Sequence, residues 1–337
     1  MTKSHVTLDD IADWGNLVAA AERAARGKRF RPAAVGFLAA LDANLAAMRT
    51  GILDGTVPVG EMTAFHIRDP KPRTIHAPCF RERVLHHAVM ARVGPVLDRG
   101  LVDDSFACRV GKGTLAAVRR AQHHVRRFPW YAKMDVRGYF ASIDHGILTA
   151  HLARRFRRPV LGLIGRMIDS HHAAPGKGLP IGSLVSQALA NAYLNPLDRF
   201  LLETRRACGF VRYMDDFLVW DTSKERATGH VRAVREFLGE RLALTLKDPP
   251  QVNRSDHGVT VCGYRVHAGA LLLAKSRRKR FRAARAYWDK QFAAGRIDDL
   301  ERQRGMDSAL SIIAHADTRA WRKRQFGIPD ARSEDGE

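Results

Sequence analysis

Cysteine is scarce in this sequence. The 337 residues include four, and their wide spacing matches neither a zinc site nor a redox motif: Cys79, Cys108, Cys208 and Cys262. This scarcity favours reduced thiols in a cytoplasmic protein. The sequence also lacks an apolar run long enough to span a bilayer, and it lacks an N-terminal signal-peptide pattern. We therefore expect neither a disulfide-stabilised secreted domain nor a membrane-spanning protein.

Acidic residues are outnumbered by basic ones. Asp and Glu total 35 whereas Lys and Arg total 56, which gives a formal net charge of +21. An excess this large predicts a polyanionic partner, with nucleic acid first and an anionic membrane surface second. Hydrophobic residues at 45% and charged residues at 27% are typical of a globular chain, and the length allows two or three subdomains.

The first part of the chain predicts helices followed by a hairpin. Apolar residues recur at helical spacing from about Leu8 to Gly55. Alternating residues around a turn marked by prolines predict a β-hairpin over Phe65–Ala77, and Pro78 leads into another helix. Arg73 and Arg81 lie at this junction of hairpin and helix. They are candidates for contacts with a triphosphate.

A second basic turn follows that helix. It ends at Thr114, the expected N-cap of a helix over Leu115–Val125, and it contains Arg109 and Lys112 as candidates for nucleic-acid contacts. Three His-His doublets, at residues 86–87, 123–124 and 171–172, lack the spacing of a metal site. We expect them to be surface residues or to face RNA.

An unusual pair of acids interrupts an apolar stretch. Residues Phe210–Trp220 read Phe-Val-Arg-Tyr-Met-Asp-Asp-Phe-Leu-Val-Trp, which predicts two short strands joined by a tight turn with Asp215 and Asp216 at its tip. Two anions between core strands are costly to desolvate unless a cation or strong donors offset them. Asp-Asp is also ordinary turn chemistry, so this pair alone leaves a purely structural role open.

A third carboxylate favours a catalytic role for the pair. The first half of Trp130–Phe140 predicts a strand, and Asp135 stands at its end before a turn at Gly138. Carboxylates from a strand end and a hairpin tip can together hold two Mg²⁺ ions. Two such ions, about 4 Å apart, activate an attacking 3′-hydroxyl and neutralise a departing pyrophosphate. That chemistry requires acids rather than histidines or thiols.

The order of these motifs resembles that of reverse transcriptases. The most specific are Tyr-Met-Asp-Asp in a strand–turn–strand setting and the upstream Asp-x-x-x-x-Phe that runs from Asp135 to Phe140. The resemblance covers roughly residues 15–325. Its motifs lie at residues 73–83, 105–114, 133–140, 178–195, 213–216, 244–247 and 263–264.

The resemblance implies an α+β right-hand polymerase that performs RNA-directed DNA synthesis with two Mg²⁺ ions. Residues 1–130 would form the fingers and, at their end, part of the palm; residues 131–268 would form the palm with its antiparallel sheet; and residues 269–330 would form a short helical thumb. Residues 331–337 would be a frayed tail. The implied metal ligands are Asp135, Asp215, Asp216 and the main-chain carbonyl of Val136, and the implied nucleotide-binding residues are Arg73, Arg81, Phe140, Ile181, Gln187 and Lys247.

The composition becomes strongly basic from Lys275 onward. Aromatic residues are interleaved with the cations, which predicts a helix face along the backbone of an RNA/DNA duplex. Nothing after this segment is long enough for an RNase H, endonuclease or maturase domain, so we expect a bare polymerase core. The candidates for duplex contacts are Lys275, Arg277, Arg278, Arg280 and Arg282.

One loop indicates a subtype. Leu179–Gln187 reads Leu-Pro-Ile-Gly-Ser-Leu-Val-Ser-Gln, similar to the Ile-Gly-x-x-x-Ser-Gln signature of bacterial enzymes from diversity-generating retroelements. Most group II intron and retron relatives carry Gln where Ile181 stands. The resemblance implies error-prone cDNA synthesis from a structured template RNA, with deoxynucleotides as substrates and a small, helical, oligomeric accessory protein as partner.

Three alternatives remain at this point. The first is another bacterial reverse transcriptase, from a retron, a group II intron lineage or a phage-defence system. The second is a non-catalytic RNA-binding module with the same fold, which the presence of all three carboxylates disfavours. The third is an RNA-dependent RNA polymerase, which Phe140 disfavours because its ring would crowd a ribose 2′-hydroxyl.

Overall fold

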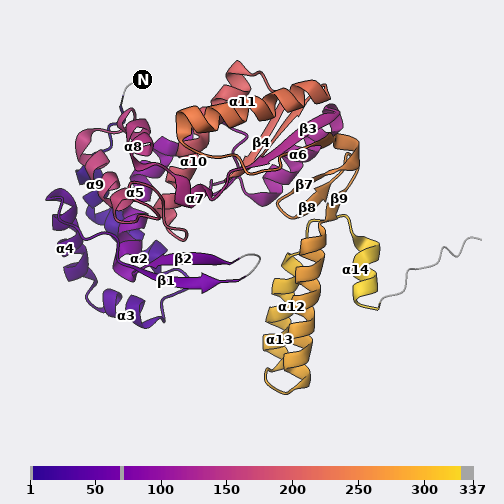
Figure 1. The fold of residues 1–337 in the computed structure, drawn as a ribbon. Coiled ribbons are helices and arrows are strands. Elements are labelled where there is room, and N and C mark those ends of the chain that lie inside the picture. The colour runs from indigo at the N-terminus through magenta and orange to yellow at the C-terminus, as the bar shows by residue number, and fades with distance from the viewer. Residues whose placement is uncertain (1–2, 69–71, 328–337) are drawn as a thin grey trace, which may run out of the picture.

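The computed structural model describes residues 3–68 and 72–327 and has a mixed α+β architecture (Figure 1). No helix within these ranges combines the length and the apolar composition that crossing a membrane requires.

The helices are α1 (Leu8–Ala12), α2 (Trp14–Ala25), α3 (Pro32–Ala39), α4 (Leu41–Leu53), α5 (Phe80–Arg99), α6 (Thr114–Arg127), α7 (Tyr139–Ser142), α8 (His145–Ala153), α9 (Arg158–Asp169), α10 (Leu184–Arg199), α11 (Lys224–Leu242), α12 (Lys275–Ala293), α13 (Asp299–Ser311) and α14 (Arg319–Gln325), with a π-helical turn η1 (Phe200–Thr204) and a 3₁₀ turn η2 (Ser255–His257). The strands are β1 (Met62–Ile67), β2 (Arg73–Pro78), β3 (Trp130–Asp135), β4 (Gly209–Tyr213), β5 (Asp216–Asp221), β6 (Gln251–Arg254), β7 (Val259–Val261), β8 (Tyr264–Val266) and β9 (Leu271–Leu273).

The middle of the chain forms a four-stranded antiparallel sheet in the order β4-β5-β3-β6, here called the central sheet. Side chains on β5 alternate between two cores, as the period of two along a strand requires. Phe217 and Val219 pack in the larger core, which includes residues of α10 and α11. Leu218 and Trp220 pack in a second core with α6 and the strands β7 to β9. The sheet is therefore buried on both faces, which makes it a rigid support for the side chains at its strand ends.

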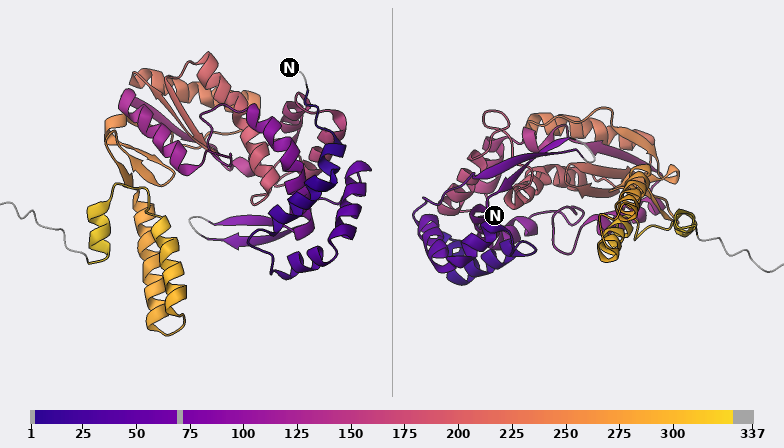
Figure 2. Two further views of the ribbon diagram at one scale, coloured as in Figure 1. Left: turned by 180° about the vertical axis from the view of Figure 1, so that it is seen from behind. Right: turned by 90° about the horizontal axis from the view of Figure 1, so that it is seen from below.

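The N-terminal half consists mainly of helices. The 20-residue helix α5 packs against α2 and α10, so it joins the N-terminal helices to the part of the chain that contains the sheet. The antiparallel β1–β2 hairpin extends from this half toward the side on which α12 and α13 lie, as views from the front and from behind both show (Figures 1 and 2).

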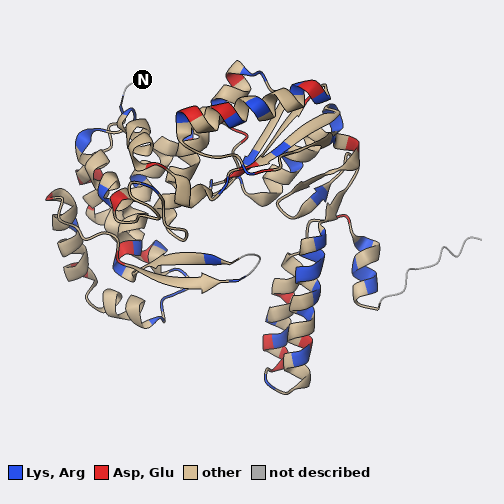
Figure 3. Cartoon of the chain, in the orientation of Figure 1, with Lys and Arg blue, Asp and Glu red and all other residues tan. Residues whose placement is uncertain are grey.

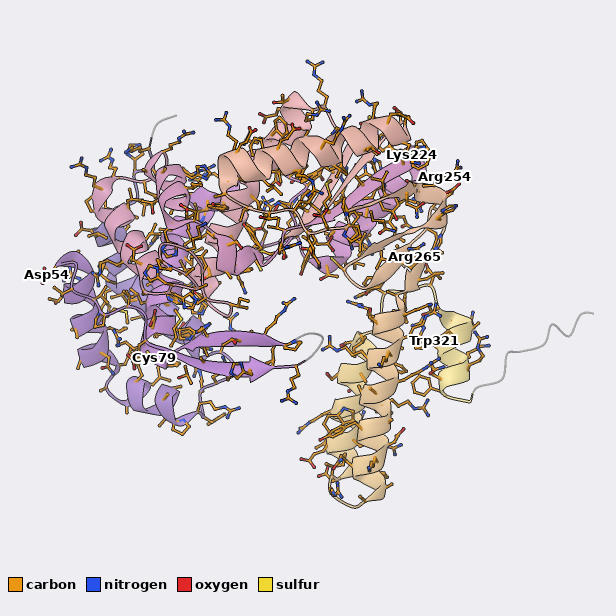
Figure 4. All side chains as sticks on the ribbon, in the orientation of Figure 1. Asp54, Cys79, Lys224, Arg254, Arg265 and Trp321 are labelled. Carbon is orange, nitrogen blue, oxygen red and sulfur yellow. The ribbon has the colours of Figure 1, made fainter. Side chains whose placement is uncertain are left out.

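The C-terminal part is a small sheet followed by a helical hairpin. The strands β7, β8 and β9 form a three-stranded antiparallel sheet, and α12 begins two residues after β9 ends. The guanidinium of Arg277 lies over the ring of Tyr264 at 4.1 Å, which ties the start of α12 to β8. Trp321 of α14 packs edge-on against the buried Phe281 of α12, with ring centroids 5.6 Å apart (Figure 4).

Most of the expected elements are present, with two corrections. The N-cap of α6 is Gly113, which adopts φ +101°, and the Thr114 hydroxyl instead donates to the hydroxyl of Tyr213 at 3.2 Å. The expected exposure of the His doublets is also wrong for His86 and His124, which are 2% and 4% exposed. Burial lowers the pKa of His124 to about 4, so its ring is neutral, and His86 contacts the buried Glu82 at 3.3 Å. The predicted frayed tail, Ala331–Glu337, lies outside the described residues.

Candidate active site

The β4–β5 hairpin brings Asp215 and Asp216 to one end of the central sheet. Strand β4 ends at Tyr213 and β5 begins at Asp216, so the turn consists of Met214 and Asp215. The sequence predicted a tight turn here with both acids at its tip, but Asp216 is the first residue of β5 and pairs with Tyr213. Met214 adopts φ +61°, a left-handed conformation that is uncommon for a residue with a side chain. Such a turn persists only when neighbouring contacts fix it.

A buried ion pair beneath the turn supplies those contacts. The fully buried guanidinium of Arg212 donates to both carboxylate oxygens of Asp198 on α10 at 2.7–2.9 Å. It also donates to the side-chain oxygen of Asn191 at 2.9 Å and to the carbonyl oxygen of Met214 at 3.0 Å. Breaking such a pair leaves an uncompensated buried charge, which costs about 3–5 kcal/mol. This network was not predicted from the sequence, although an arginine inside an otherwise apolar strand is a signal for it.

Asp135 ends β3 directly opposite Asp216 in the antiparallel register. Each of these acids contacts a lysine: Lys247 Nζ lies 2.8 Å from Asp135 Oδ2, and Lys133 Nζ lies 3.1 Å from Asp216 Oδ2. Lys133 also donates to the Thr260 carbonyl of β7 at 2.9 Å. The second carboxylate oxygen of Asp216, Oδ1, is buried and has no hydrogen-bond partner in the described part of the chain. A cation would satisfy this costly orphaned oxygen.

The crowding of the acids changes their protonation. Burial and the nearby charge of Asp135 raise the pKa of Asp215 to about 6. Burial also raises the pKa of Asp216, although Lys133 opposes the shift. Carboxylates that repel one another are stabilised by a cation between them, and Mg²⁺ prefers oxygen ligands of this kind. No three His, Cys, Asp or Glu side chains in the described ranges form a ready-made metal site. Mg²⁺ commonly takes one or two carboxylates from a protein and its other ligands from substrate phosphates and water.

Removing the Asp215 charge should stabilise the metal-free protein in a pH-dependent way. The folded-state pKa of about 6 lies above the ordinary value of 3.8, so wild-type stability falls as pH rises through 6. After allowance for solvent screening, we expect Asp215→Asn to raise the free energy of unfolding by about 1 kcal/mol at pH 8. Well below the unfolded-state pKa of 3.8 the gain should vanish, because the wild-type carboxyl is then protonated in both states. Urea denaturation in EDTA measures both values, and an equal gain at both pH values would contradict this account.

The two arginines predicted to bind a triphosphate have different surroundings. Arg73, exposed at the start of β2, is close enough to Asp215 that its charge opposes the rise in the pKa of that carboxyl. Arg81 instead pairs with Glu61 at 2.9 Å and donates to the carbonyl oxygen of Pro58. The structure thus brings Arg73 toward the acids and engages Arg81 elsewhere, and a triphosphate role for Arg81 stays a prediction.

The loop before α10 packs against the β1–β2 hairpin. The carbonyl oxygen of Ile181 accepts a hydrogen bond from the His76 amide at 2.7 Å. Gly182 adopts φ +116°, and a Cβ on it would lie 2.8 Å from the carbonyl oxygen of His76. Glycine is therefore required both by the backbone conformation and by this close approach. These contacts fix the position of Ile181 beside the hairpin that carries Arg73.

The same loop contacts the helix after Asp135. Leu179 donates its amide to the carbonyl oxygen of Phe140 in α7 at 2.8 Å, and the half-buried Phe140 ring packs edge-on against Tyr139. Gln187 lies in the first part of α10 and is half-buried, one turn after the N-cap Ser183. The loop before α10 therefore contacts both Phe140, through Leu179, and the β1–β2 hairpin, through Ile181.

Arg109 and Lys112 make contacts within their own part of the chain. Arg109 pairs with Asp98 at 2.6 Å and donates to the carbonyl oxygen of Val102 at 2.7 Å. Lys112 pairs with Asp103. These contacts stabilise the loop before α6, and the expected nucleic-acid contacts of Arg109 and Lys112 stay predictions.

The cations of the C-terminal segment lie on α12, where basic residues recur along the helix (Figure 3). Arg277 stacks on Tyr264 and donates to the carbonyl oxygen of Ile312. Arg278 and Arg282 lie about 6 Å from the ring of Trp321. The helix that holds these side chains, and with them Lys275 and Arg280, is therefore anchored by its aromatic neighbours.

The comparison with protein families is decisive for the central part of the chain. A family model described as reverse transcriptase (RNA-dependent DNA polymerase) matches residues 67–248. This range includes all three candidate acids, Lys133, Lys247 and the loop around Ile181.

Individual relatives are distant and longer. Protein YkfC of Escherichia coli (strain K12) is 26% identical over 178 residues, which are 49% of this chain and 45% of that protein. The group II intron-encoded protein LtrA of Lactococcus lactis subsp. cremoris is 24% identical over 162 residues, 45% of this chain and 27% of that protein. The match thus spans less than half of the length of either relative. Among solved structures, telomerase from Candida tropicalis in complex with the TWJ fragment of telomeric RNA aligns with a TM-score of 0.49 and 12% identity, over 78% of this chain and 55% of that one.

Proposed function

The chain belongs to the reverse transcriptase family, and we propose that it is an RNA-directed DNA polymerase that copies an RNA template with deoxynucleoside triphosphates. The observation that carries the proposal is the register of β3 and β5, which sets Asp135 opposite Asp216 and beside Asp215. Acids in this arrangement suit nucleotidyl transfer with two Mg²⁺ ions. The net charge of +21 suits a nucleic-acid substrate.

The family and the mixed α+β architecture give the right-hand polymerase fold. Within it we assign the fingers to residues 1–130, the palm to residues 131–268 and the thumb to residues 269–330. The central sheet supports this assignment of the palm, and the basic helix α12 supports that of the thumb.

We assign the metal ligands to Asp135, Asp215 and the Val136 carbonyl oxygen, with Asp216 in support. When bound, Mg²⁺ would activate the primer hydroxyl and neutralise the departing pyrophosphate. The chain's own part is to orient the reactants on a rigid sheet. We assign Arg73, Arg81 and Lys247 to the triphosphate, Phe140 to the sugar, Ile181 and Gln187 to the nascent pair, and Lys275, Arg277, Arg278, Arg280 and Arg282 to the duplex backbone.

We further propose the diversity-generating retroelement type, which makes error-prone cDNA from a structured RNA. The support is the loop sequence Ile181 to Gln187 and the contact of Ile181 with the hairpin beside the acids. A retron, group II intron-derived or phage-defence reverse transcriptase is the alternative, and template and variable repeats near the gene would distinguish them.

Primer extension tests the general proposal. The purified chain should extend a generic DNA primer on RNA in Mg²⁺ and should stop when EDTA is added. We expect this extension to be weak, and we expect template-specific initiation only with a small, helical, oligomeric accessory protein encoded beside it. Efficient and specific cDNA synthesis by the isolated chain would contradict the need for a partner, whereas no extension under either condition would contradict the polymerase proposal.

Replacing Ile181 by Gln tests the subtype. An isoleucine has no donor or acceptor, whereas a glutamine amide can make a polar contact that a mispaired base disrupts. Such contacts supply on the order of 1–3 kcal/mol of discrimination, roughly 5- to 150-fold, and we expect Ile181→Gln to recover about fivefold. The resemblance to the retroelement enzymes directs the expected gain to template adenines.

Sequencing cDNA from one template measures this effect. Ile181→Val, which keeps an apolar β-branched side chain, is the matched control and should leave the errors at adenine unchanged. An equal adenine error rate for wild type and Ile181→Gln would refute the assigned role of Ile181.

A further inference from the structure

A cavity of about 590 Å³ lies between α8, α10 and α11, and none of the residues assigned to the active site lines it. In Figure 1 these three helices lie on the side of the molecule opposite to the one from which α12 and α13 extend. Its volume falls within the range of about 300–1,000 Å³ that is typical of small-ligand sites. Its lining residues are His151, Leu152, Arg154, Arg155, Ala192, Asn195, Pro196, Arg199, Phe237, Arg241 and Leu242.

The charge of the cavity is all of one sign. Four arginines line it. Within the described part of the chain, no Asp or Glu lines it. Arg199 pairs with Glu203 at 2.7 Å, but Arg154, Arg155 and Arg241 have no acidic partner among the described residues. Burial and the nearby Arg199 lower the pKa of Arg155. Like charges held together at a half-buried site are unfavourable, so an anion in the cavity would be strongly attracted.

The rest of the lining suits a flat apolar group. Phe237 stacks on Phe200 with ring centroids 4.7 Å apart, which fixes its orientation in the wall of the cavity. Leu152 and Leu242 add apolar surface. The Nδ1 atom of His151 is buried and has no hydrogen-bond partner in the described ranges, so a polar edge of a ligand could bond to it.

We propose that this cavity binds an unpaired nucleotide of single-stranded RNA, with its phosphate at the arginines and its base against Phe237. An inorganic anion would use the arginines but not the apolar wall, whereas a nucleotide uses both. A base stacked on an aromatic ring beside a cationic groove is how proteins hold single strands with little sequence preference. The site would hold a strand on the side of the molecule opposite to the one from which α12 and α13 extend (Figure 1).

Fluorescence anisotropy with a labelled single-stranded 20-nucleotide RNA tests the proposal. The double variant Arg155→Gln/Arg241→Gln removes two cavity charges, and we expect it to weaken binding at least about tenfold at physiological salt. The matched control Arg158→Gln/Arg232→Gln removes two exposed charges outside the cavity, and we expect about twofold or less. Because Arg155 is half-buried, Arg154→Gln/Arg241→Gln, at two exposed positions, is a second variant should the first fail to fold.

Two further measurements separate the possible outcomes. Wild type should bind an abasic strand of the same length more weakly than the RNA, and the cavity variant should lose that preference. If the cavity variant and the control variant lose the same RNA affinity, the effect comes from net charge alone and the proposal is overturned. Loss of ATP binding with unchanged RNA binding would assign the cavity to a free nucleotide instead and also overturn it. Extension of a saturating, pre-annealed primer–template should persist in the cavity variant, so this result is independent of the polymerase proposal.

Discussion

Asp135→Asn and Asp215→Asn should each reduce Mg²⁺-dependent primer extension by at least about 1,000-fold while RNA binding stays within about twofold of wild type. The substitution keeps the size of each side chain and removes the negative charge that holds a cation. The structure gives a reason for the large effect, since burial and the charge of Asp135 disfavour the ionised Asp215 carboxylate, and a bound cation would offset both. We expect RNA binding to depend on the basic surface, which neither change alters.

Asp216→Asn should also abolish extension, although its role differs. One oxygen of Asp216 contacts Lys133 and the other is buried without a partner in the described chain. The variant would remove that ion pair as well as a carboxylate that we propose supports the metal ligands. Asp256→Asn is the matched control, because Asp256 is an exposed acid paired with Arg254 far from the hairpin tip. Full extension by Asp135→Asn or Asp215→Asn, with the same Mg²⁺ dependence as wild type, would end the two-metal proposal.

The local parts of the site could be predicted from the sequence. Two apolar runs around Asp215 and Asp216 define a hairpin through their own composition, and Asp135 at the end of Trp130–Asp135 follows from the same pattern. Likewise the basic helix from Lys275 was evident because charge and aromatic residues recur at short range. Patterns of this kind depend on neighbours in sequence, which a single chain displays directly.

The pairing between distant segments could not be predicted. The register that sets Asp135 opposite Asp216 joins strands about 80 residues apart, and period-2 patterns do not specify partners. The same limit explains why the Arg212–Asp198 pair and the contact of Lys133 with Asp216 were overlooked. Propensity alone also misplaced an N-cap, because Thr114 is a good capping residue but Gly113 supplies the positive φ.

Burial of polar residues was the other source of error. His86 was expected to be exposed, yet it contacts the buried Glu82 at 3.3 Å, a partner one helical turn away. The Arg109 side chain is likewise 9% exposed and pairs with Asp98, and its contact with nucleic acid stays a prediction. Charged and polar side chains become buried when a partner satisfies them, and the partner is visible only in three dimensions.

Phe140→Ala should let the enzyme incorporate ribonucleotides. Phe140 lies five residues after Asp135, and its carbonyl oxygen is fixed by the amide of Leu179 in the loop that carries Ile181. If the ring meets the sugar as proposed, it would exclude a 2′-hydroxyl by volume, and a steric conflict of this size costs about 1–3 kcal/mol. We therefore expect the preference for deoxynucleotides to fall by up to about 100-fold, with deoxynucleotide incorporation still measurable.

Single-nucleotide incorporation with dNTP and NTP measures the ratio of kcat/KM values. Phe140→Tyr keeps the ring and should retain the preference for deoxynucleotides. Phe30→Ala removes an exposed ring in the N-terminal part of the chain and should leave that preference unchanged. The half-buried ring also packs against Tyr139, so Phe140→Ala could lose activity by unfolding. If the variant loses all incorporation, its melting temperature shows whether it is still folded. A folded Phe140→Ala protein with wild-type sugar preference would place the ring away from the sugar, and the RNA-dependent RNA polymerase alternative would then no longer be disfavoured by this residue.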